Sequence, residues 1–112
     1  MGDYFFGKVK DRWTSTAADT NGGGVTVTKT APSPTTKKLI ATQISVSGDA
    51  AALVTVESPA ATVLWRKRYA GSFSDTVTFV PGTVAGADGQ AMLVVISAGT
   101  ANTEANLSGF TI

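Results

Sequence analysis

The run Trp65-Arg66-Lys67-Arg68-Tyr69 is the one stretch of this chain that combines a cluster of basic side chains with aromatic ones. Such a run can bind nucleic acid, because the cations contact phosphates while the aromatic rings stack on bases. On a β-strand, however, Arg66 and Arg68 would face one side of a sheet and Trp65, Lys67 and Tyr69 the other, which leaves only a short phosphate-binding footprint. Nucleic acid is therefore not the expected partner. We predict instead that Trp65 anchors the core and that Arg66 and Arg68 pair with carboxylates, either across a sheet or across a subunit boundary.

The carboxylates are the other groups that could carry chemistry. A glycosidase-type pair needs two of them on rigid elements that face one cleft, and only Glu57 and Glu104 lie near predicted strands. Asp49, Asp75 and Asp88 lie beside glycine or serine, where an aspartate side chain usually stabilises a turn. Histidine and cysteine, which supply most general bases, thiolates and metal ligands, do not occur in the sequence. We therefore predict no catalytic residues, no metal site and no cofactor, so the protein is expected not to be an enzyme.

The composition points to one globular domain with a weakly charged surface. Hydrophobic residues make up 43% of the 112 residues, which is enough for a core, while charged residues make up only 15%. The net charge of +1 lacks the strong basic footprint of a nucleic-acid binder. Apolar runs are too short to span a membrane, and the N-terminus lacks a signal-peptide core. We expect a soluble protein that is made in the cytoplasm and has no membrane partner.

The elements that must position these residues are predicted to be strands. Residues 91–97 are apolar on both faces of a strand, which predicts a central strand that is buried on both sides. Further strands are predicted at 25–30, 39–47, 52–57, 62–69, 76–80 and 104–112, at a spacing of roughly 8–12 residues. Because no segment has a helical period, we predict an all-β fold, a single antiparallel β-sandwich or jelly-roll-like domain. The predicted core comprises Ile44, Val54, Val63, Trp65, Phe79, Val94, Ile96 and Leu107.

Two details of the strands are also predicted from the alternation. In the strand at 39–47, Ile40, Ile44 and Val46 are expected on one face. In the last strand, Gly109 lies where the apolar phase changes, so a bulge or a twist is expected there.

The N-terminal segment differs from the rest and is predicted to be an extended arm. Residues 1–24 hold Tyr4, Phe5, Phe6 and Trp13 among alternating charges, and neither a strand nor a helix period is sustained. A glycine run at 22–24 and a proline linker at 31–36 separate these aromatics from the later strands. We therefore divide the chain into an arm and linker at 1–36 and a sandwich domain at 37–112. The aromatics either fold back onto the core of the domain or dock on a neighbouring subunit; in the second case a chain that begins at Val25 would still fold.

A family resemblance adds to these observations. It is carried by the segments 44–51 (Ile-Ser-Val-Ser-Gly-Asp-Ala-Ala), 63–66 (Val-Leu-Trp-Arg), 79–82 (Phe-Val-Pro-Gly), 86–91 (Gly-Ala-Asp-Gly-Gln-Ala), 97–100 (Ser-Ala-Gly-Thr) and 106–110 (Asn-Leu-Ser-Gly-Phe). Over residues 39–112 the chain resembles small virion proteins of tailed bacteriophages, which are β-sandwich or jelly-roll-like proteins of heads or tails and include capsid decoration (cement) proteins.

The resemblance implies a structural protein of the virion that sits on the capsid surface. It would bind the major capsid protein or another virion protein, and its own copies as a homo-oligomer, with a trimer favoured. A tail-associated structural protein and a carbohydrate-binding β-sandwich module are the alternatives. A sugar site normally presents exposed aromatic platforms beside polar groups, and only Trp13, Trp65 and Tyr69 could serve as such platforms.

Overall fold

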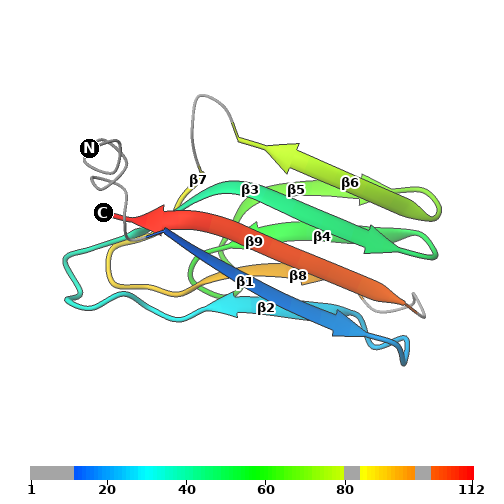
Figure 1. The fold of residues 1–112 in the computed structure, drawn as a ribbon, viewed down its shortest axis with the longest axis horizontal. Coiled ribbons are helices and arrows are strands. Elements are labelled where there is room, and N and C mark those ends of the chain that lie inside the picture. Colours follow the sequence, from blue (N-terminus) through cyan, green and yellow to red (C-terminus); the bar gives the residue numbers. More distant parts are fainter. Residues whose placement is uncertain (1–11, 80–83, 98–101) are drawn as a thin grey trace, which may run out of the picture.

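The computed structural model of the protein describes residues 12–79, 84–97 and 102–112. These residues form two antiparallel β-sheets that pack face to face, without a helix in the described ranges (Figure 1). The prediction of an all-β sandwich is therefore confirmed.

The strands divide between two sheets, which we call sheet I and sheet II. Sheet I contains, in spatial order, β1 (Arg12–Asp19), β9 (Thr103–Thr111), β3 (Leu39–Gly48) and β6 (Phe73–Thr78), and the short β7 (Val84–Ala85) also pairs with β3. Sheet II contains, in spatial order, β2 (Val25–Lys29), β8 (Met92–Ile96), β4 (Ala52–Glu57) and β5 (Val63–Tyr69).

The order of the strands is that of a jelly roll. With β7 set aside, the first strand pairs with the last and the pairing proceeds inward: β1 with β9, β2 with β8, β3 with β6, and β4 with β5, all antiparallel. The chain is thus one long hairpin that is rolled up so that successive pairs alternate between the two sheets. In this arrangement most backbone groups of the strands pair with a neighbouring strand, and β1, β2, β5 and β6 lie at the sheet edges.

The predicted domain boundary at residue 37 is wrong, because β1 and β2 are part of the sandwich. β1 pairs with β9 along its whole length, and β2 pairs with β8 in the same way. β1 was not predicted because its inward-facing residues include Trp13, Ser15 and Ala17, a mixture of large, polar and small side chains without apolar alternation. The predicted arm at 1–24 therefore belongs to the fold from residue 12 onward.

The glycine run that was predicted to be a flexible spacer is the turn between β1 and β2. The carboxylate of Asp19 accepts hydrogen bonds from the backbone N–H groups of Asn21 (3.1 Å) and Gly23 (3.0 Å). Gly22 and Gly24 have positive φ angles of 80° and 76°, which glycine adopts without steric cost. The hydrogen bonds to Asp19 thus hold residues 21–23 in a turn, although the composition of this segment is typical of a linker.

The core lies between the two sheets and matches the predicted alternation in most strands. Ile44, Val54, Val94, Ile96 and Leu107 are at most 1% exposed, as predicted. Trp65 and Phe79 are only partly buried and pack against the edge of the core, with their ring centroids 5.6 Å apart in an edge-to-face contact.

Two core predictions fail at strand surfaces. Val63 is 46% exposed, because it lies at the start of edge strand β5 beside a register shift in the β4–β5 ladder. β8 is a central strand with Met92, Val94 and Ile96 buried, as predicted, but Leu93 and Val95 on its other face are only half-buried. The outer face of sheet II is therefore apolar where β8 crosses it.

A bulge in β3 produces the irregularity that was predicted near Gly109. The β3–β9 register shifts between Ala41 and Gln43, so Thr42 is an extra residue on β3, opposite the end of β9. Because one extra residue reverses the side-chain phase, Ala41 and Ile44 both point to the core. Ile40 therefore pairs with Phe110 on the outer face, and the prediction that it shares the face of Ile44 is wrong.

Candidate functional site

Arg66 and Arg68 lie on the outer face of sheet II, as the alternation predicted. Arg66 is opposite Thr55 and Arg68 is opposite Leu53, whereas Lys67 lies opposite the buried Val54. Both arginines are exposed, and neither has an ion pair within the described part of the chain. Carboxylate partners inside the chain, which the sequence left open, are therefore not found there.

Glu57, a carboxylate on β4, is already engaged in other hydrogen bonds. Glu57 accepts a hydrogen bond from the hydroxyl of Thr55 (2.6 Å) through one oxygen and from the backbone N–H of Ala61 (2.7 Å) through the other. These bonds hold the turn between β4 and β5, where Ala61 has a positive φ of 73°. Glu57 thus stabilises the turn and leaves the two arginines without it.

An apolar stripe runs beside the arginines. Leu53 on β4 and Leu93 and Val95 on β8 are half-buried and face outward, and the cross-strand register places Val95 next to Thr55. We call Leu53, Leu93, Val95, Arg66 and Arg68 together the outer patch of sheet II. Such a patch combines apolar area with unsatisfied cations, which is the composition of many protein interfaces.

The outer face of sheet I has a different character. Its outward residues are mostly small hydroxyl and amide side chains, among them Thr14, Thr76, Ser45 and Asn106, with Thr14 hydrogen-bonded to Ser108 and Ser45 to Thr76 (3.3 Å each). The hydroxyls are thus partly satisfied within the face. The two outer faces of the sandwich differ. That of sheet I joins Arg12 to Phe110 and Ile40 near one end, whereas that of sheet II joins Leu53, Leu93 and Val95 to two arginines.

A polar cluster connects the edge strands β5 and β6, which belong to different sheets. The hydroxyl of Tyr69 donates a hydrogen bond to Asp75 (2.6 Å), Lys67 forms an ion pair with the same oxygen (3.2 Å), and the Tyr69 ring stacks on Phe73 at a centroid distance of 4.3 Å. The hydrogen bond from Tyr69, followed by that from Lys67, lowers the pKa of Asp75 below its ordinary value of 3.8. Burial, followed by the bond to Asp75, raises the pKa of Tyr69 above its ordinary value. Asp75 therefore lies within β6 and joins the two sheets, and the prediction that it stabilises a turn is wrong.

This cluster predicts a defined pH dependence of stability. A carboxylate whose pKa is lowered by folding stabilises the protein above its unfolded pKa, and this stabilisation is lost as the pH falls through the lower folded value. We therefore expect Asp75→Asn to lower the free energy of unfolding at pH 7, and the difference from wild type to shrink as the pH falls below about 4. Urea unfolding at pH 7 and at pH 3 measures this difference. In a Tyr69→Phe background, which keeps the stacked ring, the effect of Asp75→Asn should be smaller; an unchanged effect would contradict the assigned cause.

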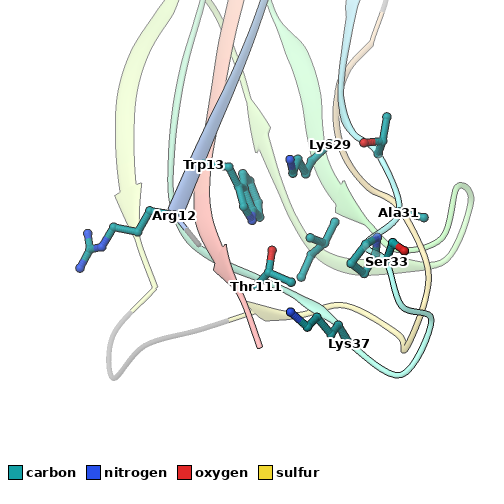
Figure 2. Close-up of a pocket in the computed structure, with 10 residues that line it drawn as sticks. Arg12, Trp13, Lys29, Ala31, Ser33, Lys37 and Thr111 are labelled. Atoms are coloured by element: carbon teal, nitrogen blue, oxygen red, sulfur yellow. The ribbon is translucent and has the colours of Figure 1, made fainter. Parts of the chain in front are cut away.

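A cavity, which we call the end cavity, opens at one end of the sandwich. At this end β1 and β3 begin and β2 and β9 end, as Figure 1 shows. The end cavity has a volume of about 440 Å³, and Figure 2 shows its lining. Trp13, Leu39 and the segment 30–33, which we call the strap, are among its lining residues. Lys29 lies over the Trp13 ring, with its ammonium 5.7 Å from the centroid.

Trp13 is therefore not a free anchor for a neighbour, as the arm prediction had it. It is half-buried on the inner face of β1, packs against the core of its own chain and lines the end cavity. Its indole Nε1–H is buried and has no hydrogen-bond acceptor in the described ranges. The other three predicted arm residues, Tyr4, Phe5 and Phe6, lie outside the described residues.

Two further carboxylates, those of Asp88 and Asp49, contact neighbouring side chains. Asp88 forms an ion pair with Lys38 (3.4 Å), and Asp49 accepts a hydrogen bond from the side chain of Asn102 (3.1 Å). In the residues that the structure covers, no group of three or more carboxylate, histidine or cysteine side chains is placed to hold a metal ion. The same residues contain no helix of the length and hydropathy needed to cross a membrane.

Comparison of the chain with protein-family models and with curated proteins gives no match.

Proposed function

We propose that this protein is a non-enzymatic structural protein of a tailed-bacteriophage virion, which decorates and stabilises the capsid by binding the major capsid protein and further copies of itself. The observation that carries the proposal is the outer patch of sheet II, where an apolar stripe lies beside two exposed arginines that have no ion pair in the described ranges. A partner that covers this patch removes apolar area from water and supplies carboxylates to the arginines. The complementary surface is therefore apolar at its centre and acidic on the side of β5.

The fold gives further support at the level of analogy. Jelly rolls are common among viral capsid domains, and also among lectins, so the strand order favours these uses without selecting one. The capsid surface as the location, synthesis in the host cytoplasm and a threefold arrangement of copies follow from the resemblance to decoration proteins. A position in the tail is the alternative. Tyr4, Phe5 and Phe6, which lie outside the described residues, remain proposed as partner-binding residues in addition to the outer patch.

The outer patch predicts which cations matter for binding. We expect Arg66→Gln and Arg68→Gln each to weaken binding to assembled particles by about tenfold or more, because each would leave a partner carboxylate without its charged donor. Lys67→Gln is the matched control, since it removes the same charge from the same strand but from the opposite face. Co-sedimentation of each variant with purified particles measures the affinity.

Two outcomes would count against the proposal. If wild-type protein does not bind assembled particles, the virion function is lost. If Lys67→Gln weakens binding as much as the two arginine variants do, the effect reflects net charge, and the outer patch is not the interface.

A further inference from the structure

The end cavity is lined by polar and apolar residues and by one aromatic ring, that of Trp13. Four segments meet there: the start of β1, the end of β2 with the strap 30–33, the start of β3 and the end of β9. Its volume of about 440 Å³ falls within the range of about 300–1,000 Å³ that is typical of small-molecule sites. The strap residues Thr30, Ala31 and Ser33 are exposed, so this part of the lining is at the surface of the protein.

Several polar groups around the cavity have no acceptor or donor within the described residues. The hydroxyls of Thr30, Ser33 and Thr111 form no hydrogen bond with that part of the protein, and Lys29 contacts the Trp13 ring without a carboxylate partner. The buried Nε1–H of Trp13 also lacks an acceptor. Of these groups the Trp13 Nε1–H is the buried one, and a buried donor without an acceptor is uncommon, because buried polar groups are normally satisfied.

The charges of the lining residues favour a negatively charged ligand. Among the described lining residues Arg12, Lys29 and Lys37 are basic and none is acidic. Figure 2 shows that Lys29 and Lys37 lie on either side of the cavity, whereas the guanidinium of Arg12 points away from it. An anionic group between the sheets would meet Lys29 directly, and the hydroxyls would bind neighbouring polar groups of the same molecule.

We propose that this cavity binds a small anion that carries hydroxyl groups, of the sugar-acid class, with its carboxylate at Lys29 and its ring against Trp13. The ring of Trp13 offers apolar contact to the C–H face of a sugar, and the three hydroxyls can donate to and accept from the sugar hydroxyls. Binding at this site is separate from the proposed particle binding, because the cavity lies at the β1–β2 edge and the arginines on β5 at the opposite edge of sheet II. A free sugar acid and the terminal residue of an acidic glycan share this chemistry.

Two-dimensional ¹H–¹⁵N NMR of the full chain tests the proposal, because the chain has two tryptophans and hence two indole N–H signals. The Trp13 signal, assigned with a Trp65→Phe variant, should shift on titration with glucuronic acid, while the Trp65 signal stays in place. Glucose and sodium acetate at equal ionic strength should cause smaller shifts, since each lacks one half of the recognised chemistry. Methyl β-glucuronide separates the two sources: a response equal to that of the free acid indicates a glycan terminus, and a weaker one indicates the free acid.

The variant Lys29→Gln should weaken the binding of glucuronic acid about tenfold, because it removes the charged donor while it keeps a polar side chain with part of the aliphatic stem. Lys67→Gln, which removes an equal charge at the far edge of the sandwich, should leave the affinity unchanged. A native spectrum of Lys29→Gln shows that the variant is folded, so that its affinity can be compared. The proposal is overturned by the absence of a Trp13 shift, by an equal shift with acetate alone, or by equal affinity of Lys29→Gln and wild type.

Discussion

Replacing Gly109 by alanine is expected to lower the free energy of unfolding by about 3 kcal/mol or more. A Cβ atom at this position would collide with the backbone carbonyl oxygen of Ile40, and it would lie 2.9 Å from both the carbonyl carbon of Ile40 and Cζ2 of Trp13. Backbone in the middle of a sheet cannot move aside as a flexible side chain can. The variant must therefore separate β3 from β9 at the bulge or displace Trp13. Urea unfolding followed by circular dichroism measures the loss.

Gly71→Ala is the matched control for this substitution. Gly71 lies in the exposed turn between β5 and β6, where a Cβ atom would meet no heavy atom within 4 Å. Its free energy of unfolding should stay within about 1 kcal/mol of wild type, because only the entropy of the unfolded chain changes. If Gly109→Ala lowered the free energy of unfolding no more than Gly71→Ala does, the close approach of β9 to Ile40 would be wrong.

Strand alternation was enough to predict the sandwich because most strands of this chain bury one regular face. In β4 and β8 every second residue is apolar and buried, as Val54 and Val56 and then Val94 and Ile96 illustrate. Alternation alone does not fix the order of strands, because that order depends on pairings between residues far apart in sequence. The jelly roll therefore emerged as one of two alternatives from the sequence and as the observed topology only from the ladders.

The failures have local causes that alternation cannot detect. The bulge at Thr42 reverses the side-chain phase in the middle of β3, and no residue type marks it on its own strand. The signal lay on the partner strand, since Gly109 without a side chain makes room for the Ile40 carbonyl and for Trp13. Composition misled in the same way at 22–24, where glycines that suggest a spacer form a tight turn under Asp19.

The candidate sites also differ in how far the sequence could predict them. The outward direction of Arg66 and Arg68 follows from the two-residue period of one strand, so the sequence predicted it. The end cavity brings together Trp13, Lys29 and Thr111 from three strands of two sheets, and only the fold makes them neighbours. The sequence singled out Trp13 as an aromatic that needs cover, but its cover is the chain's own core.

Deleting residues 1–24 is expected to abolish cooperative folding. If these residues were a docking arm, a chain beginning at Val25 would fold normally. In the structure the deletion removes β1, which pairs with β9 over its full length, and it uncovers the edge of β9 together with the inner side of Ala105 and Leu107. Without β1, β9 becomes an edge strand that is paired only with β3, so it exposes backbone groups on one side together with apolar side chains, and such an edge favours aggregation. The truncated chain should give a weak β signal in circular dichroism and no sharp thermal transition.

A synthetic peptide of residues 12–24 separates the contribution of β1 from that of the residues before it. Because β1 supplies one edge strand, the peptide should bind the truncated chain and restore a cooperative transition, as strand addition does at other open sheet edges. The same peptide with Trp13→Ser should restore it less well, since it lacks the ring that packs beside Gly109 and on the core. A truncated chain that unfolds as cooperatively as the full chain without any peptide would show that β1 is dispensable, and the division of the chain into arm and domain would then stand as the sequence predicted it.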